Sequence, residues 1–123
     1  MAPQRVLLID DEPDIRLIAE LSLAQVGGLE VTLAASGAEG LRLAETCNPD
    51  VILLDMMMPE MDGMATLARL RDNPKLRDVP VVFLTAQVAA HDRAEYLQMG
   101  AVGVIAKPFD PMTLPTELIK LLA

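Results

Sequence analysis

Aromatic residues and cysteine are nearly absent from this sequence. Its 123 residues include no tryptophan, one tyrosine, two phenylalanines and one cysteine. A single cysteine, Cys47, excludes an internal disulfide framework. No histidine or second cysteine lies near it, so we interpret Cys47 as a half-buried helix residue and not as a nucleophile. The hydrophobic residues, 52% of the chain, are mostly aliphatic and are sufficient for one core.

Long apolar runs and an excess of positive charge are also missing. No run approaches the ~20 residues that a membrane span needs, and residues 1–4 lack the hydrophobic segment of a secretion signal. We therefore expect a cytoplasmic protein that does not enter a membrane. Eighteen acidic residues against ten Lys and Arg give a net charge of −8, which argues against nucleic-acid binding by this chain. Its partners are expected to be proteins.

The order of apolar segments predicts an α/β fold in a single domain that spans residues 1–123. Short apolar or alternating runs predict strands at residues 5–9, 30–34, 51–55, 79–85 and 102–106. Helical spacing and stop signals predict helices at residues 13–26, 36–47, 64–72, 89–99 and 114–121. Strands and helices that alternate through short loops are typical of a parallel sheet with helices on both faces and right-handed crossovers.

The stretch from residue 51 to residue 63, VILLDMMMPEMDG, carries the clearest functional signal. Four consecutive apolar residues lead directly into Asp55. Periodicity alone does not separate a buried strand from a buried helix, but the Asn-Pro-Asp turn before the run and the proline after it favour a strand. A carboxylate at the end of a buried strand costs free energy unless it is compensated, so Asp55 is either paired for structure or kept for chemistry.

Other polar residues stand where neighbouring strands end. Asp10 and Asp11 follow the first predicted strand, Thr85 ends the fourth, and Lys107 follows the fifth. Each has an ordinary explanation when taken alone: the acids can cap a helix, the threonine suits a strand, and the lysine suits the surface. Ligands of open parallel sheets bind outside the carboxyl ends of the strands, which is where all these groups collect.

Together, these groups predict a metal-assisted phosphoryl site. Three carboxylates placed close together repel one another and call for a cation, and oxygen-only ligands favour a hard ion such as Mg²⁺. A lysine and a hydroxyl at the same place are suited to phosphate oxygens. Asp55 would then be the nucleophile that accepts the phosphoryl group.

The same residues resemble a known family over essentially the whole chain. The matching motifs are Asp10-Asp11, the D-x-x-M-P-x-M-D-G run from Asp55 to Gly63, Thr85-Ala86 and Lys107-Pro108-Phe109. In this order and at these separations they resemble the receiver domain of bacterial two-component response regulators. The resemblance implies a flavodoxin-like, doubly wound sheet of strand order 2-1-3-4-5, which places the first, third, fourth and fifth strands side by side.

The resemblance also implies a role for each residue. Asp55 would take a phosphoryl group from a phosphohistidine on a sensor histidine kinase or phosphotransfer protein. Asp11, Asp55 and the backbone carbonyl of Met57 would bind Mg²⁺, with Mn²⁺ as a second candidate, and Asp10 would act through water. The protein would catalyse its own phosphorylation and slow hydrolysis without turning over a separate substrate. It would signal to a downstream effector or output domain, and a phosphorylation-dependent dimer fits this pattern.

Three further positions follow from the resemblance. Lys107 would pair with Asp55 and later with the phosphoryl oxygens, while Thr85 would move to hydrogen-bond the phosphate. The Lys107-Pro108 bond is expected to be cis, as is usual in receivers. Val104 departs from the family pattern, because receivers usually carry Tyr or Phe there, and that ring swings inward as the threonine moves. We therefore expect the signal to pass instead through the loop after Thr85 and the fourth helix.

The residues next to the site raise two more expectations. Met57 and Gln87 occupy positions at which receivers vary their hydrolysis rate, and a pair without an acid predicts a persistent phosphoryl group. Met58 and Met64 are expected to pack against the third helix as adaptable filler. Met56 and Met57 are candidates for an exposed, compliant docking surface.

Competing interpretations are weaker. A phosphatase of the haloacid dehalogenase type would need a second acid two residues after the nucleophile, where this chain has Met57. A nucleotide-binding module would need a glycine-rich turn after the first strand, where this chain has Asp-Asp-Glu-Pro. The alternative that stays open concerns context: the chain is either a complete single-domain protein or the receiver of a larger response regulator or hybrid kinase.

Overall fold

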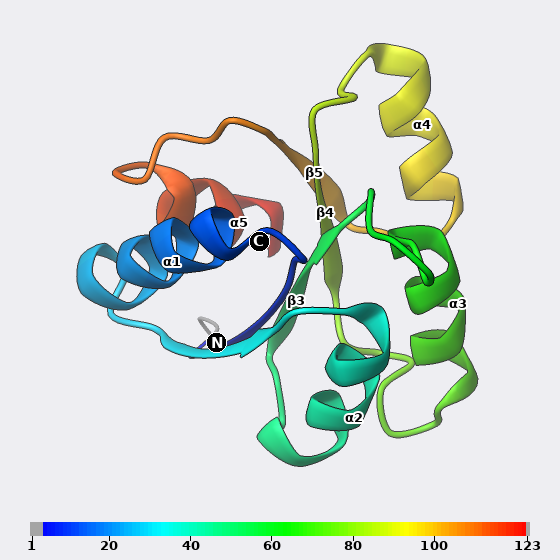
Figure 1. The fold of residues 1–123 in the computed structure, drawn as a ribbon. Helices are drawn as coiled ribbons and strands as arrows, with labels where there is room; N and C mark the ends of the chain where they lie inside the picture. The colour runs from blue at the N-terminus through cyan, green and yellow to red at the C-terminus, as the bar shows by residue number, and fades with distance from the viewer. Residues whose placement is uncertain (1–3, 123) are drawn as a thin grey trace.

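The computed structural model describes residues 4–122 as one parallel sheet flanked by helices (Figure 1). The strands are β1 (Arg5–Ile9), β2 (Glu30–Ala34), β3 (Val51–Asp55), β4 (Val81–Thr85) and β5 (Gly103–Ala106). The helices are α1 (Pro13–Leu21), α2 (Gly37–Cys47), α3 (Gly63–Asp72), α4 (Ala90–Gln98) and α5 (Leu114–Leu122), with a π-helical segment, η1 (Ser22–Val26), after α1. The strand order β2-β1-β3-β4-β5 is the predicted one.

The helices form two layers, one on each face of the sheet. Figure 1 shows α1 and α5 on one face and α2, α3 and α4 on the other. Alternate residues of a strand serve the two layers: on β1, Leu7 and Ile9 pack in the core under α2, α3 and α4, whereas Val6 and Leu8 pack in the core under α1 and α5. Strands that are buried on both faces read as continuous apolar runs, which is why β3 and β4 were recognisable in the sequence.

Side-chain caps set the start of two helices. The Ser36 hydroxyl accepts a hydrogen bond from the backbone N–H of Glu39, and the Glu39 carboxylate accepts one from the N–H of Ala35. The first bond is the N-cap of α2, and the second resembles a capping box but uses the N–H of the residue before the N-cap. The Asp62 carboxylate accepts from the N–H of Ala65 and begins α3.

Several boundaries differ from the expectation. The fourth strand begins at Val81 and not at Val79, since Pro80 has no N–H to donate to a neighbouring strand. The first helix does not continue as an α-helix beyond Leu21. It widens into η1, where the N–H of Gly27 bonds to the carbonyl of Ser22. No helix of residues 4–122 has the length and apolar character needed to cross a membrane.

Gly63 fixes the distance between the end of β3 and the start of α3. Its N–H donates to the carbonyl of Met56 at 3.0 Å. A Cβ atom at this position would lie 2.6 Å from the carbonyl oxygen of Asp55 and 2.8 Å from the Cα of Met56. Both neighbours are backbone atoms that cannot rotate away, so the close approach requires glycine.

Replacing this glycine should therefore destabilise the fold. We expect Gly63→Ala to lower the free energy of unfolding by about 2 kcal/mol or more, because the end of β3 must shift. Gly28→Asn is the control, since position 28 has open space and a φ of +68°, which asparagine tolerates; its effect should stay within about 1 kcal/mol. Urea unfolding measures both, and equal stabilities of the two variants would contradict the steric argument.

Candidate functional site

The residues singled out in the sequence meet at the carboxyl edge of the sheet. Asp10 directly follows β1, Asp55 ends β3, Thr85 ends β4 and Lys107 directly follows β5. Their strands are consecutive neighbours, with Asp55 beside Leu84 and Thr85 beside Ala106. The parallel order therefore brings together groups that are up to 97 positions apart in the chain.

Lys107 is shared by three carboxylates. Its Nζ lies 2.9 Å from Oδ2 of Asp10, 3.1 Å from Oε1 of Glu12 and 3.3 Å from Oδ1 of Asp55. Burial lowers the pKa of the ammonium, but the three carboxylates together outweigh it and raise this pKa above its ordinary value. Lys107 is therefore a permanent cation at the centre of the site.

Asp55 is a buried acid, and only one of its two carboxylate oxygens has partners. Its Oδ1 accepts from the N–H of Met57 at 3.2 Å and faces the ammonium of Lys107. Burial and the charge of Asp10 raise the pKa of Asp55 to about 7, against the lowering effects of the Met57 N–H and of Lys107. The single ammonium thus does not fully compensate the negative charge gathered around it.

The carboxylate oxygens of the site fit a hard cation. One ligand oxygen from each of Asp10, Asp11, Glu12 and Asp55 can be chosen so that all lie within 4.8 Å of one another. Oδ1 of Asp11 and Oδ2 of Asp55 are buried without a hydrogen-bond partner, and Oδ2 of Asp10 faces only the ammonium, outside hydrogen-bond geometry. Buried oxygens without donors are costly, and a Mg²⁺ bound among these carboxylates would relieve part of that cost.

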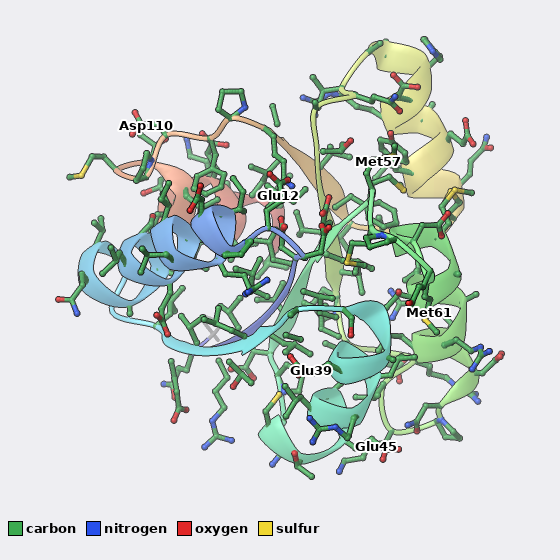
Figure 2. All side chains as sticks on the ribbon, in the orientation of Figure 1. Glu12, Glu39, Glu45, Met57, Met61 and Asp110 are labelled. Atoms are coloured by element: carbon green, nitrogen blue, oxygen red, sulfur yellow. The ribbon has the colours of Figure 1, made fainter. Side chains whose placement is uncertain are left out.

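Glu12 belongs to the cluster although it was not among the site residues expected from the sequence. It does stand at the N-cap of α1, but its side chain makes no capping hydrogen bond and reaches Lys107 instead. Figure 2 shows Glu12 at the edge of the sheet where the strands end. The only sequence signal for this role is the uninterrupted acidic run from Asp10 to Glu12.

Thr85 lies beside the cluster with its hydroxyl already engaged. It is buried, and its Oγ1 accepts from the N–H of Gln87 at 3.1 Å. Ala86, between them, is exposed. Val104 is buried on β5 opposite Phe83 of β4, in the core under α2, α3 and α4. The Lys107-Pro108 peptide bond is cis, as expected.

The methionines next to Asp55 follow the expectation only in part. Met57 is 66% exposed and labelled in Figure 2, and Met58 is buried as predicted. Met56 is not exposed: it continues the inward alternation of Leu54 and packs in the same core. Met64 is 45% exposed because it falls outside the buried stripe of α3. A docking surface at this place would therefore include Met57 and Met64 but not Met56.

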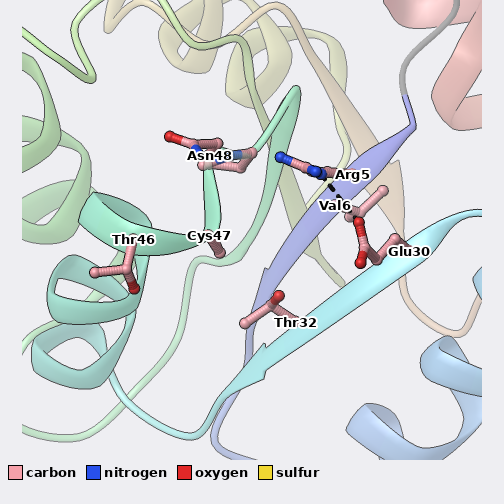
Figure 3. A pocket seen from close by; sticks show the side chains of 8 residues that line it. Arg5, Val6, Glu30, Thr32, Thr46, Cys47 and Asn48 are labelled. Atoms are coloured by element: carbon pink, nitrogen blue, oxygen red, sulfur yellow. Dashed lines mark hydrogen bonds and ion pairs between the residues drawn. The ribbon is translucent and has the colours of Figure 1, made fainter.

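A separate hollow of about 370 Å³ lies at the opposite, amino end of the strands (Figure 3). It is lined by Arg5, Val6, Glu30, Thr32, Thr46, Cys47, Asn48 and Pro49. An ion pair of 3.0 Å joins Arg5 to Glu30. Cys47 is half-buried at the end of α2, as expected, and burial raises the pKa of its thiol. This hollow shares no residue with the acidic cluster.

Comparisons with known proteins identify the family of this chain. The family model described as response regulator receiver domain matches residues 6–119. The response regulator Rre1 of Synechocystis is 37% identical over 121 residues, which cover 98% of this chain and 52% of that protein. The chain thus spans about half the length of this curated relative.

Solved structures agree with the sequence relatives. The chemotaxis protein CheY4 of Vibrio cholerae is 34% identical with a TM-score of 0.88, over 98% of this chain and 99% of that chain. The receiver domain of a sensor histidine kinase from Pseudomonas aeruginosa is 35% identical with a TM-score of 0.84, over 98% of both chains. The latter structure has a magnesium ion coordinated in its active-site cleft.

The raised pKa of Asp55 predicts how stability depends on pH without metal. The folded state holds the proton up to about pH 7, whereas the unfolded chain loses it near 3.8, so stability is lost as the pH rises through this window. With a chelator at about pH 8, Asp55→Asn should exceed the wild type in unfolding free energy by about 1–2 kcal/mol, and the gain should shrink towards about pH 5.

Asp50→Asn is the control of opposite sign. The N–H groups of Gln4 and Arg5 donate to the Asp50 carboxylate and lower its pKa. This variant should be less stable than the wild type at neutral pH, because the ionised form is the one that the fold stabilises. Urea unfolding across the pH range measures both variants. An Asp55→Asn variant without any gain at about pH 8 would show that the site is already balanced without a cation.

Proposed function

The chain belongs to the response regulator receiver family, and from this premise we propose that Asp55 is its phosphoacceptor. The observation that supports this most directly is that the two oxygens of the Asp55 carboxylate have different surroundings. Oδ1 is held by Lys107 and by the N–H of Met57, whereas Oδ2 is buried without a hydrogen-bond partner. A carboxylate oriented through one oxygen and free at the other is suited to attack phosphorus.

The proposed reaction transfers one phosphoryl group. Oδ2 of Asp55 forms a bond to phosphorus while the bond from phosphorus to the donor's histidine nitrogen breaks, and that nitrogen keeps the electron pair. The product is an acyl phosphate that carries more negative charge than the carboxylate. The ammonium of Lys107 lies 3.3 Å from Asp55 and compensates part of this charge. The hydroxyl of Thr85 would turn to donate to a phosphoryl oxygen.

We propose Mg²⁺ as the metal, with Mn²⁺ as a second candidate. Asp11, Asp55 and the backbone carbonyl of Met57 would hold the ion, and Asp10 would act through water. The buried, donor-free Oδ1 of Asp11 supports this assignment, as does the magnesium ion of the Pseudomonas receiver domain. When bound, the ion would neutralise carboxylate charge and attract phosphoryl oxygens.

The partners follow from the same proposal. The donor would be a sensor histidine kinase or phosphotransfer protein in the cytoplasm, and the phosphorylated surface would address an effector, an output domain or a second copy of the chain. Phosphorylation and slow hydrolysis would be catalysed by the chain itself. A phosphatase of the haloacid dehalogenase type is disfavoured because the thioether of Met57 cannot serve as its second acid.

Incubation with acetyl phosphate and Mg²⁺ tests the proposal. Intact-mass measurement should show the addition of one phosphoryl group to the wild type and none to Asp55→Asn. Asp72→Asn, an exposed acid at the end of α3, is the matched control and should be modified like the wild type. An adduct that persists in Asp55→Asn would overturn the assignment of the acceptor.

Met57 should set the lifetime of the phosphoryl group. Its exposed side chain stands two residues after Asp55 and offers no group that can orient an attacking water. Met57→Glu and Met57→Asn keep the backbone carbonyl and add such a group, so dephosphorylation should accelerate about three- to tenfold. Phosphate release after removal of the donor measures the rate. Met64→Glu, an exposed methionine on α3, should leave it unchanged, and a lifetime insensitive to both Met57 substitutions would refute the prediction.

A further inference from the structure

Tyr96 is the side chain that anchors α4 to the rest of the fold. It is the only tyrosine of the chain and the only buried residue of α4. Its ring meets the ring of Phe83 on β4 edge to face, with 5.3 Å between the centroids and an interplanar angle of 64°. Because the other residues of α4 are exposed or half-buried, movement of this one side chain would change how the helix sits on the sheet.

The hydroxyl of Tyr96 also holds the loop between β4 and α4. It donates to the backbone carbonyl of Gln87 at 3.3 Å. One turn earlier on the same face of α4, Nε of Arg93 donates to the carbonyl of Val88 at 3.1 Å. Two successive loop carbonyls are thus bound by two side chains of one helix.

The same loop residue connects Tyr96 to Thr85. The N–H of Gln87 donates to Oγ1 of Thr85 at 3.1 Å, while the carbonyl of Gln87 accepts from Tyr96. Both bonds use backbone atoms, so the side chain at position 87 is not needed for the connection. The threonine next to the phosphoacceptor site is linked through one residue to the buried anchor of α4.

We propose that Tyr96 is a positioning residue that holds Thr85 and the β4–α4 loop in the unphosphorylated arrangement. The inference rests on the proposed function of Asp55. When the Thr85 hydroxyl turns towards a phosphoryl oxygen, Gln87 loses its acceptor and its peptide groups must reorient. The Tyr96 hydroxyl then loses its own acceptor, and the change reaches α4 through the single buried residue of that helix.

The placement of Tyr96 accounts for the absence of a ring on β5. Val104 lies opposite Phe83 in the strand register and has no polar group that could respond to Thr85. Tyr96 packs in the same core as Phe83 and Val104, but it belongs to α4. Its hydroxyl donates a hydrogen bond to the loop before that helix. On this proposal, the residue that couples the site to the surface, Tyr96, is itself part of the responding helix, α4.

The sign of the effect follows from linkage. A hydrogen bond that forms only in the unphosphorylated arrangement lowers the affinity for any ligand that favours the phosphorylated arrangement. Tyr96→Phe keeps the ring against Phe83 and removes only the hydroxyl bond. Since 3.3 Å is long for a hydroxyl donor, we expect the lower part of the usual range, a gain of about two- to fivefold in apparent affinity for a phosphoryl analogue.

The experiment is a titration with beryllium fluoride in the presence of Mg²⁺, followed by amide spectra of the full chain. Tyr96→Phe should bind about two- to fivefold more tightly than the wild type, and Gln98→Ala, an exposed residue of the same helix, should match the wild type. In the wild type, signals of Gln87 and of the Tyr96 ring should shift together on binding. Without the analogue, the folding equilibrium constant of Tyr96→Phe should fall by no more than the same factor, about two- to fivefold, and urea unfolding measures it; a larger fall would indicate lost packing and would contradict a purely positioning role.

Two outcomes would overturn the inference. If Tyr96→Phe binds the analogue as the wild type does, or if Tyr96 signals stay fixed while those around Asp55 shift, the hydroxyl does not restrain the loop. The wild-type arm reports separately on the proposed function. A wild type that binds the analogue no better than Asp55→Asn would remove the phosphoacceptor assignment, and the role of Tyr96 with it.

Discussion

One ammonium shared by three carboxylates is the constraint on which the site depends. Lys107 contacts Asp10, Glu12 and Asp55 within 3.3 Å, because the parallel order brings the carboxyl ends of β1, β3 and β5 to one edge of the sheet. Burying charges in this way rarely stabilises a fold, because desolvation offsets the attraction. The arrangement leaves two carboxylate oxygens without donors and a third facing only the ammonium. The cluster destabilises the folded state, and its negative charge is only partly compensated. Such a cluster is suited to bind a cation and to undergo a change of charge at Asp55.

The chemical and responding parts of the molecule differ in how firmly they are held. Asp55 ends a strand that is buried along its whole length, and Gly63 lets α3 pack directly against that end. The core therefore fixes the position of Asp55, the proposed phosphoacceptor. In contrast, α4 has one buried residue, and its preceding loop is held by a few side-chain hydrogen bonds. Elements with few buried contacts reorganise at low cost in free energy, so a charge change in the rigid part can move the loosely held part.

The sheet and most of the site could be predicted because buried parallel strands have a recognisable sequence pattern. Uninterrupted apolar runs identified β3 and β4, and the polar residues that follow strands necessarily meet at one edge. Glu12 was missed because the orientation of its side chain depends on a contact with Lys107, which is 95 positions away in the sequence. The burial of Met56 could have been read from the alternation that starts at Leu54. The contact from Tyr96 to a loop carbonyl depends on the packing of α4, which local sequence patterns do not specify.

A structure with Mg²⁺ and beryllium fluoride bound would show whether Asp55 is the phosphoacceptor and where the metal lies. We expect the beryllium to bond to Oδ2 of Asp55, with its fluorides in contact with Nζ of Lys107 and Oγ1 of Thr85. We expect the metal to lie between Asp11, Asp55 and the carbonyl of Met57. An adduct on another carboxylate would refute Asp55 as the phosphoacceptor, and a metal bound away from this edge of the sheet would refute the proposed metal site.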